Sequence, residues 1–433
     1  MKTSHHCKLL LLSSIVSSSA FAAGFQINPT ASSVARAMGG NGIIGEDIGD
    51  MFFNPASLSL FSGEEVFQAG GTYLSVENQF VDQGSFNTIN LGGGPVSLPL
   101  LGTNRASDDS GVPIGLFYTR AAPWNEEVQL GLSITSPWGL STTYDPDWLG
   151  RYHTISSELM VVDINLAASW KVSDSLLLGA GISGQIADAT LEQAIPDVAS
   201  NSDLLARIEG DDNALGFNAG LIWSPTAELK LGLSYRSKVS HDLEGDRTIS
   251  AQGMEINKVG ALAPLTVPES LHLSMHYSPA GQRWSVAAGI RQTNWSRFEE
   301  LRVNYADGSS PTVSPQLWED SYTSGLSFDY RLSSNSKVIG SIGYDESPVP
   351  SARLRSAQVP EFDRRVLGFG YEMENPLDLC DGCKFYFGYH RVFAKERDIA
   401  NTNELNAAFS STLNGYYEKS TVDVFSGHFS ITF

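Results

Sequence analysis

The chain is dominated by short segments in which apolar and polar residues alternate one by one. The clearest of these segments span residues 213–225, 270–278 and 283–291. A period of two is that of a β-strand, because successive side chains of a strand point to opposite faces. Each segment therefore has one apolar and one polar face. Such strands fit either a soluble β-sandwich or a barrel that separates lipid from a polar lumen.

The connections between the segments favour the barrel. Fourteen alternating segments follow residue 64, and short and long connections alternate between them. The segments lie near residues 65–76, 110–121, 127–143, 157–171, 175–190, 213–225, 229–243, 268–279, 283–297, 319–332, 337–348, 363–375, 384–397 and 417–433. The short connections include 122–126, 172–174, 226–228, 280–282 and 333–336, and the long ones are 77–109, 144–156, 191–212, 244–267, 298–318, 349–362 and 398–416. Short turns on one side and long loops on the other are typical of outer-membrane barrels. We therefore predict an all-β fold, a fourteen-stranded antiparallel transmembrane β-barrel over residues 64–433.

Both ends of the chain agree with an outer-membrane location. Lys2 and Lys8 precede an apolar stretch and the small-residue site Ala20-Phe21-Ala22, so residues 1–22 have the pattern of a secretory signal peptide. No later stretch of about 20 apolar residues could form a membrane-spanning helix. The last segment ends on Phe433, and a terminal aromatic residue on an alternating strand resembles the signal that the outer-membrane assembly machinery recognises.

The charge balance excludes one class of partner. The chain carries 48 acidic and 28 basic residues, which gives a formal net charge of −20. An acidic chain lacks the basic patch that attracts phosphates, so we expect no nucleic acid partner. We expect a monomer that contacts outer-membrane lipid and lipopolysaccharide.

Residues 23–63 do not fit the alternating pattern. They are rich in Gly, Ala, Ser and Asn and precede the first strand. A fourteen-stranded barrel is wider than an eight-stranded one, whose lumen side chains can fill. We therefore predict that residues 23–63 form a compact hatch that plugs the lumen.

A series of short motifs occurs in order along the chain. They are Ala23-Gly24-Phe25-Gln26, residues 39–49, Asn54-Pro55-Ala56, Ser133-Ile134-Thr135-Ser136 with Gly139-Leu140, Asn218-Ala219-Gly220, Tyr235-Arg236-Ser237, Pro268-Glu269, Trp295-Ser296, residues 345–350 and Val359-Pro360. Their order and spacing resemble the FadL/TodX family of outer-membrane long-chain fatty acid and hydrocarbon transporters. The resemblance implies a fourteen-stranded barrel with an N-terminal hatch. It also implies that ligand is captured among extracellular loops, bound near the first mature residues and released sideways through a gap made by a kinked third strand.

The third predicted strand contains its own interruption, Pro137-Trp138-Gly139. Proline cannot donate to a strand ladder, and a break in a lipid-exposed wall is costly unless it lines a cavity. A simple strand end would also explain the pattern. The resemblance implies that Pro137 and Gly139 form the kink, that Asn54 and Pro55 of the hatch contact it, and that Ser110 of strand two takes the place of the usual alanine in this contact.

The residues that would hold a ligand are less well defined. By the resemblance, Phe25 lies at the interior pocket, although it could also simply anchor the hatch. A fatty acid anion needs Arg or Lys partners, yet two positions that are basic in well-known family members are Gln193 and Glu319 here. The candidate partners of the carboxylate are then Arg291, Arg353 and Arg355. These arginines could instead pair only with acidic residues of the loops. A neutral hydrocarbon therefore stays open as the ligand.

Other candidate sites have structural interpretations. Cys380 and Cys383 fall in a predicted periplasmic turn, where an oxidising compartment favours a structural disulfide. His272 and His276 share a strand face, and we expect two polar lumen residues rather than metal ligands. The sequence shows no nucleophile–base–acid arrangement and no nucleotide-binding loop, so we expect no enzyme activity, no cofactor and no metal.

The sequence therefore predicts a passive transporter of long-chain fatty acids or related hydrophobic molecules. The alternatives are a hydrocarbon-specific channel of the same family, a general water-filled porin, an outer-membrane enzyme and a surface receptor.

Overall fold

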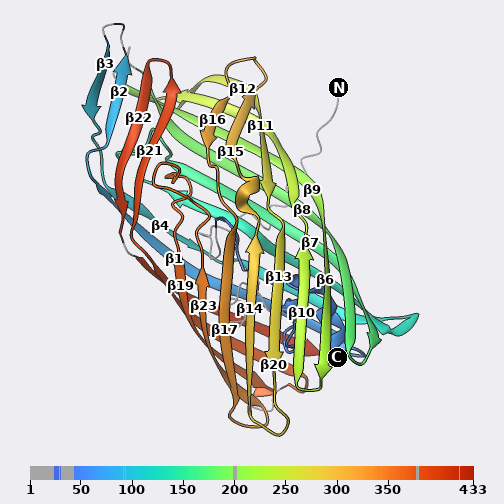
Figure 1. The fold of residues 1–433 in the computed structure, drawn as a ribbon. Helices are drawn as coiled ribbons and strands as arrows, with labels where there is room; N and C mark the ends of the chain where they lie inside the picture. Colours follow the sequence, from blue (N-terminus) through green and yellow to red (C-terminus); the bar gives the residue numbers. More distant parts are fainter. Residues whose placement is uncertain are drawn as a thin grey trace.

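The computed structural model describes residues 24–28, 30, 43–90, 92, 94–197, 202–376, 380–418 and 420–433. The predicted signal peptide lies outside the described residues. The wall is a closed antiparallel barrel of fourteen strands (Figure 1). In order around the barrel they are β1 (Val66–Asp82), β4 with β5 (Arg105–Gly111, Ile114–Ala122), β6 (Asn125–Thr143), β7 (Ser156–Ser173), β8 (Leu176–Asp197), β9 (Ser202–Thr226), β10 with β11 (Leu229–Arg236, Val239–Ala251), β12 with β13 (Met254–Val267, Ser270–Tyr277), β14 (Trp284–Thr293), β17 (Ser321–Arg331), β18 (Ser336–Asp345), β19 (Arg364–Glu374), β20 (Cys383–Ala394) and β23 (Ser420–Thr432). The first and last strands close the barrel, and their register pairs Val66 with Thr432. The predicted fold class is thus confirmed.

The two faces of the wall differ in polarity as the alternation predicts. In β13, Leu271 and Leu273 are 44% and 52% exposed, whereas His272 and Ser274, which alternate with them, are buried. This is the reverse of a soluble sheet, because the apolar side chains point outward. Lipid can solvate the outer face, and the inner face is left to polar groups.

Two of the wall strands are interrupted at prolines. Pro113 separates β4 from β5, and Pro268 separates β12 from β13. Proline lacks a backbone N–H, so a continuous ladder cannot run through it. The carbonyl of Pro113 still accepts a hydrogen bond from the Thr72 N–H at 3.1 Å, which keeps the wall joined across the break.

The long connections are more regular than predicted. Segments 191–212 and 244–267 largely continue the wall strands β8, β9, β11 and β12. Other long connections contain additional strands: β2 (Phe86–Asn90), β3 (Pro95–Pro99), β15 (Glu300–Tyr305), β16 (Thr312–Pro315), β21 (Arg397–Asn406) and β22 (Phe409–Tyr417). Their backbone groups need partners, and hairpin pairing supplies them. We call this end of the barrel the loop end, at the top of Figure 1, and the opposite end the turn end.

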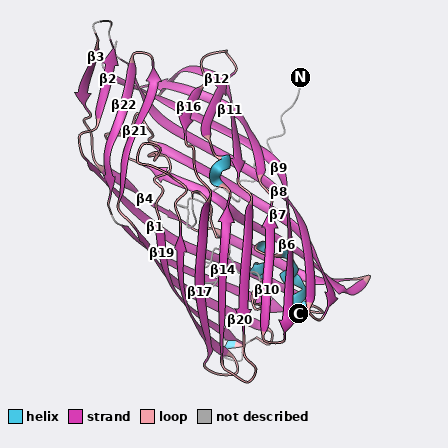
Figure 2. Ribbon diagram, viewed as in Figure 1, coloured by secondary structure: helices cyan, strands magenta, loops and turns pink. Residues whose placement is uncertain are grey.

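The described N-terminal residues lie against the inner face of the wall. Two short 3₁₀ helices, η1 (Ile48–Phe52) and η2 (Pro55–Phe61), are enclosed by the strands near the turn end (Figure 2). Met51 and Leu58 are fully buried and pack with Phe117 and Ala167 of the wall. A third short helix, η3 (Trp295–Arg297), follows β14. In the described part of the chain, no helix is both long and apolar enough to cross a membrane.

The inner cavity and the break in β6

Strand β6 contains one extra residue at Ser136-Pro137. Thr135 pairs with Asp163 of β7, but Trp138 pairs with Val161, so three steps on β6 oppose two on β7. This bulge reverses the faces of the strand, because side chains alternate with a period of two. Thr135 is buried on the lumen side before the bulge, and Trp138 is buried on that side after it.

The bulge also marks the place where β6 loses a neighbour. On the other side, β6 pairs with β5 only as far as the Thr135–Gly115 pair, and the described pairings join β4 to β1 but not to β6. The backbone of β6 beyond Thr135 therefore needs partners from elsewhere. On the β5 side, the pairing of β6 thus ends beside Pro137 and Gly139, and we call this gap in the pairing the break in β6.

Residues 24–28, which we call the strap, supply these partners. Gln26 forms an isolated antiparallel bridge with Trp138. The Ile27 N–H donates to the Pro137 carbonyl at 2.8 Å, and the Gly139 N–H donates to the Phe25 carbonyl at 2.9 Å. The strap thus takes the place of a missing strand along the edge of β6.

Phe25 of the strap sits within a cluster of aromatic rings. Its ring lies 4.8 Å from Trp295, 5.7 Å from Phe298 and 6.0 Å from Trp138, in edge-to-face arrangements. Such pairs stabilise a contact by about 0.5–1.5 kcal/mol beyond the area they bury. Gly24 is required beside it, since its φ is +69° and a Cβ there would lie 2.5 Å from the Trp295 ring.

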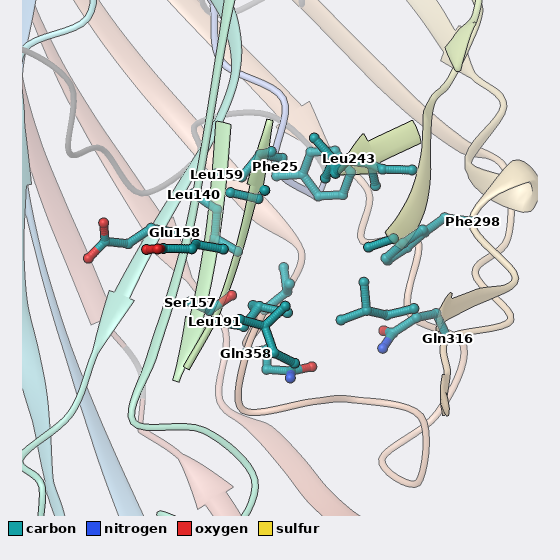
Figure 3. A pocket seen from close by; sticks show the side chains of 18 of the residues that line it. Phe25, Leu140, Ser157, Glu158, Leu159, Leu191, Leu243, Phe298, Gln316 and Gln358 are labelled. Carbon is teal, nitrogen blue, oxygen red and sulfur yellow. The ribbon is translucent and has the colours of Figure 1, made fainter. Parts of the chain in front are cut away.

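Phe25 also forms one wall of an apolar hollow, which we call the inner cavity. The lining residues are Phe25, Leu140, Ser157, Glu158, Leu159, Ala189, Leu191, Ile208, Glu209, Gly210, Leu243, Ala261, Ala263, Leu265, Phe298, Leu301, Gln316, Gln358 and Val359. Figure 3 shows Phe25 and Leu243 at one end and the amides of Gln316 and Gln358 at the other. Glu158 is exposed, and its carboxylate points away from the apolar lining (Figure 3).

A second, more polar hollow lies next to the inner cavity. This outer vestibule is lined by residues of the loop-end hairpins, such as Val313 and Asn403, and by His153. It shares Leu191, Ile208, Leu301 and Gln358 with the inner cavity. The two hollows therefore adjoin each other, and Phe25 of the strap borders the inner cavity.

The hydrogen bonds of Asn54 do not lead to the break in β6, where the family resemblance placed Asn54 and Pro55. The Asn54 Nδ2 donates to the Leu221 carbonyl of β9 at 3.1 Å, and its Oδ1 caps η2 by accepting from the Ala56 N–H. Glycines of β8 and β9 permit this approach. A Cβ at Gly220 would lie 2.1 Å from the Asn54 Oδ1, and one at Gly179 would lie 2.3 Å from the Ala56 nitrogen. The strap bonds to the edge of β6 instead. This edge offers a row of backbone groups, and only another extended segment can pair with them.

Ser110 lies in β4, where its backbone pairs with Ser75 of β1. Its side chain lies outside the described part of the structure. The proposed contact between Ser110 and the break therefore stays a prediction.

The three arginines proposed to capture a carboxylate are not part of the cavity lining. The Arg291 guanidinium donates to Thr323 Oγ1 at 3.3 Å in the lumen. Arg355 donates to the carbonyls of Glu361 and Asp398, and Arg353 is exposed. Strand β14 carries Arg291, and the connection between β18 and β19 carries Arg353 and Arg355. Neither element directs these side chains into the inner cavity. Phe25, in contrast, lies at the cavity as the resemblance implied.

The lumen toward the turn end is polar and charged. His272, His276, Asp329 and Lys337 are all buried there in wall strands. The two histidines lie on the lumen face, as their spacing predicted. Within the described residues, no group of three or more His, Cys, Asp or Glu side chains could hold a metal ion. An apolar ligand that moved toward the turn end would have to remove water from these polar groups.

The segment 43–61, which we call the anchor, is held by charges as well as by packing. The Glu46 carboxylate bonds to Lys337, and Arg331 lies 3.6 Å from it. Burial alone would raise the pKa of Glu46, but the charges of Lys337, Lys384 and Arg331 outweigh burial and lower this pKa to about 2. Arg236 adds a hydrogen bond from its Nη2 to the Phe52 carbonyl at 2.8 Å.

Cys380 and Cys383 are joined by a disulfide, with a Cα–Cα distance of 5.5 Å. It precedes β20 at the turn end. Its oxidation in the cell stays a prediction.

Several cavity residues were missed from the sequence. Gln316 and Gln358 line the inner cavity, and Trp318 packs against Phe25 beside it. All three lie in the predicted long connections 298–318 and 349–362. A signal was present for Trp318, because large aromatic residues are unusual in exposed loops and indicate burial. The two glutamines gave no such signal.

Comparisons with known proteins agree with this geometry. The family model described as outer membrane protein transport protein (OMPP1/FadL/TodX) matches residues 13–433. A long-chain fatty acid transport protein of Escherichia coli O6:H1 (strain CFT073) is 26% identical over 424 residues, which cover 89% of this chain and 92% of the relative.

Two solved structures share the fold. A Pseudomonas aeruginosa FadL homologue matches with a TM-score of 0.83 at 22% identity, over 94% of this chain and 99% of that chain. The P. putida toluene transporter TodX matches with a TM-score of 0.65 at 17% identity, over 92% and 97%. The family comprises outer-membrane transport proteins rather than enzymes, which confirms the predicted location and class. Since the family model covers nearly the whole sequence, this chain belongs to the FadL/TodX family of outer-membrane transport proteins.

Proposed function

We propose that this protein passively takes up long apolar molecules, such as long-chain fatty acids or hydrocarbons, and releases them sideways into the outer membrane. The ligand enters at the loop end, which faces outward, and collects in the outer vestibule. It then moves into the inner cavity and leaves at the break in β6. Two relatives, a long-chain fatty acid transport protein and a toluene transporter, support this class of ligand.

The dual position of Phe25 carries this proposal. Its side chain lines the inner cavity, and its carbonyl accepts the hydrogen bond from the Gly139 N–H at the β6 edge. A ligand that displaces the Phe25 ring therefore also pulls on the bond that covers the break. Occupation of the cavity and opening of the wall are coupled through one residue.

The energies permit this coupling. The two backbone hydrogen bonds of the strap contribute about 1 kcal/mol each, and burial of the Phe25 side chain contributes about 2–3 kcal/mol. A chain of about ten CH₂ groups gains roughly 8 kcal/mol on burial. The ligand can thus supply the free energy that displaces the strap.

The polar lumen supports a sideways exit. Entry into the aqueous periplasm would expose the apolar chain again, at roughly 0.8 kcal/mol per CH₂, and the path would cross buried charges such as Asp329 and Lys337. Release into the bilayer avoids both costs. We also propose that residues 23–63 act as the hatch that keeps the lumen closed to water.

A reversible cross-link of the strap tests the proposal. Gln26 and Trp138 form a bridge whose flanking hydrogen bonds make it a non-hydrogen-bonded pair, and such pairs have a Cα separation of about 4.5 Å, within disulfide range. The variant Gln26→Cys/Trp138→Cys is made with Cys380→Ser and Cys383→Ser. When oxidised, it should assemble and bind ligand but fail to deliver a labelled fatty acid to cells.

The reduced form of the same variant is the matched control, because it carries identical side chains. Reductant should restore uptake to the level of the two single-cysteine variants. Normal uptake by the oxidised, correctly assembled barrel would contradict lateral release past the strap.

A further inference from the structure

The chemistry of the cavity lining departs from that of an anion-binding site. Within the described residues, neither the inner cavity nor the outer vestibule is lined by a lysine or an arginine. The charged lining residues are acids: Glu158 and Glu209 at the cavity, and Glu192 and Glu404 at the vestibule. Of these acids, Glu192 and Glu209 pair with Arg207, which belongs to neither lining, and the Glu158 carboxylate points away from the cavity (Figure 3). The described lining therefore offers a carboxylate ligand no cation of its own.

The vestibule histidine does not change this balance. His153 is buried, and burial lowers its pKa to about 4 although its hydrogen bond to the Asn401 side chain acts in the opposite direction. Its imidazole is therefore uncharged at neutral pH. Among the described residues, the linings of the inner cavity and the vestibule therefore hold no charged donor that would offset the desolvation of a carboxylate.

The polar end of the inner cavity is made of neutral groups. Gln316 is buried, and its Nε2 donates to Ser314 Oγ at 3.2 Å. Its Oε1 is buried without a hydrogen-bond partner in the described structure. The amide of Gln358 lies across the same end of the cavity (Figure 3). A buried acceptor without a partner is costly, so this end favours a ligand that brings a donor.

We propose that the inner cavity selects an uncharged amphiphile, a long apolar chain that ends in a hydroxyl group. The hydroxyl donates to Gln316 Oε1 and lies near Gln358, and the chain extends toward Phe25. An ionised carboxylate has only acceptor atoms and would leave Gln316 Oε1 unpaired. A carboxylic acid binds only in its protonated form, which has an O–H to donate. This inference rests on the proposed function and names the ligand class of the same site.

Calorimetric titration of the full chain in detergent tests this selectivity with three matched probes, 1-decanol, decanoate and decane. The heat of partition of each probe into empty micelles is subtracted. At about pH 8, 1-decanol should bind at least about tenfold more tightly than decanoate, because nearly all of the acid is ionised. Lowering the pH should tighten decanoate binding by about tenfold per unit, until the acid is protonated. It should leave 1-decanol unchanged.

Two substitutions at the polar end sharpen the test. Gln316→Leu should weaken 1-decanol binding about three- to tenfold, which corresponds to one hydrogen bond, and leave decane unaffected. Gln358→Arg supplies a cation and should tighten decanoate binding at pH 8. Gln193→Leu is the control, because Gln193 lines the vestibule but not the inner cavity.

The outcomes separate this inference from the proposed function. Decanoate binding at pH 8 that equals or exceeds 1-decanol binding would overturn the neutral-ligand inference alone. Equal affinity for decane and 1-decanol would also overturn the neutral-ligand inference, because the hydroxyl group would then contribute nothing to binding. Failure of all three probes to bind would overturn the inference together with the proposed function.

Discussion

The anchor and the strap belong to the same N-terminal region, but the wall holds them in different ways. The anchor is fixed by ion pairs of Glu46, by the hydrogen bond from Arg236 and by the glycine contacts of Asn54. The strap is joined to β6 by two backbone hydrogen bonds and by ring packing of Phe25. In the strap, Gln26 Oε1 and Asn28 Nδ2 are buried without partners in the described structure.

This difference indicates which part is built to move. Removing one partner from a buried ion pair costs about 3–5 kcal/mol of stability. Backbone hydrogen bonds and apolar contacts can be exchanged for those of a ligand at smaller cost. The anchor can therefore stay in place while the strap yields. In the proposed mechanism, the anchor would keep water out of the lumen while ligand is released.

The largest effect is expected when the anchor is displaced. Gly179→Val places a side chain where the Ala56 nitrogen lies 2.3 Å from the Cβ position, so η2 must leave its site. We expect steady ion conductance in planar bilayers for this variant and little conductance for the unmodified protein. Gly184→Val on the same strand is the control, because its nearest neighbour is Leu215 at 3.9 Å. A closed channel in assembled Gly179→Val would mean that the anchor does not seal the lumen.

Blocking the break in β6 should have a large effect on transport alone. Gly139→Arg fills the edge that the strap covers, so uptake should be lost while ligand binding from outside is kept. Assembly is checked by heat-modifiable mobility on a gel. A size series through Gly139→Ala should show uptake falling as the side chain grows. Transport at the normal rate by an assembled Gly139→Arg barrel would direct the ligand through the hatch instead.

A smaller effect is expected from the charge of Glu46. Its pKa in the folded protein, about 2, lies below its ordinary value of 4.5. The ion pairs therefore stabilise the anchor fully above about pH 4.5, and this stabilisation is lost as the pH falls toward 2. Brief channel openings should become several-fold more frequent at about pH 3 than at pH 7.

Glu46→Gln should show this leak already at pH 7 and should lose most of the pH response. Glu374→Gln is a suitable control, since Glu374 is exposed and touches the same lysine cluster only through Lys384. A pH response that persists unchanged in Glu46→Gln would assign it to another group. Uptake should change little in either variant, since the strap is untouched.

The sequence alone determined the wall and the place where it breaks. Alternation of period two is local, so residues 270–278 indicate a strand with a lipid face whatever its neighbours are. Pro137 likewise carries its own signal, because the missing N–H is a property of one residue. The length of the loop-end strands was underestimated, because pairing beyond the membrane depends on the partner strand.

Only the tertiary structure decided what meets at the break and in the cavity. Asn54 bonds to Leu221 of β9, and Phe25 bonds to Gly139, across large separations in sequence. Gln316 and Gln358 come together from separate loops, while the nearest candidate arginines point elsewhere. Such contacts depend on how the strand register and the loop paths direct side chains, and no local pattern encodes that direction. The sequence therefore specified a barrel with a weak point in its wall, and the fold decided which groups cover that point and line the cavity beside it.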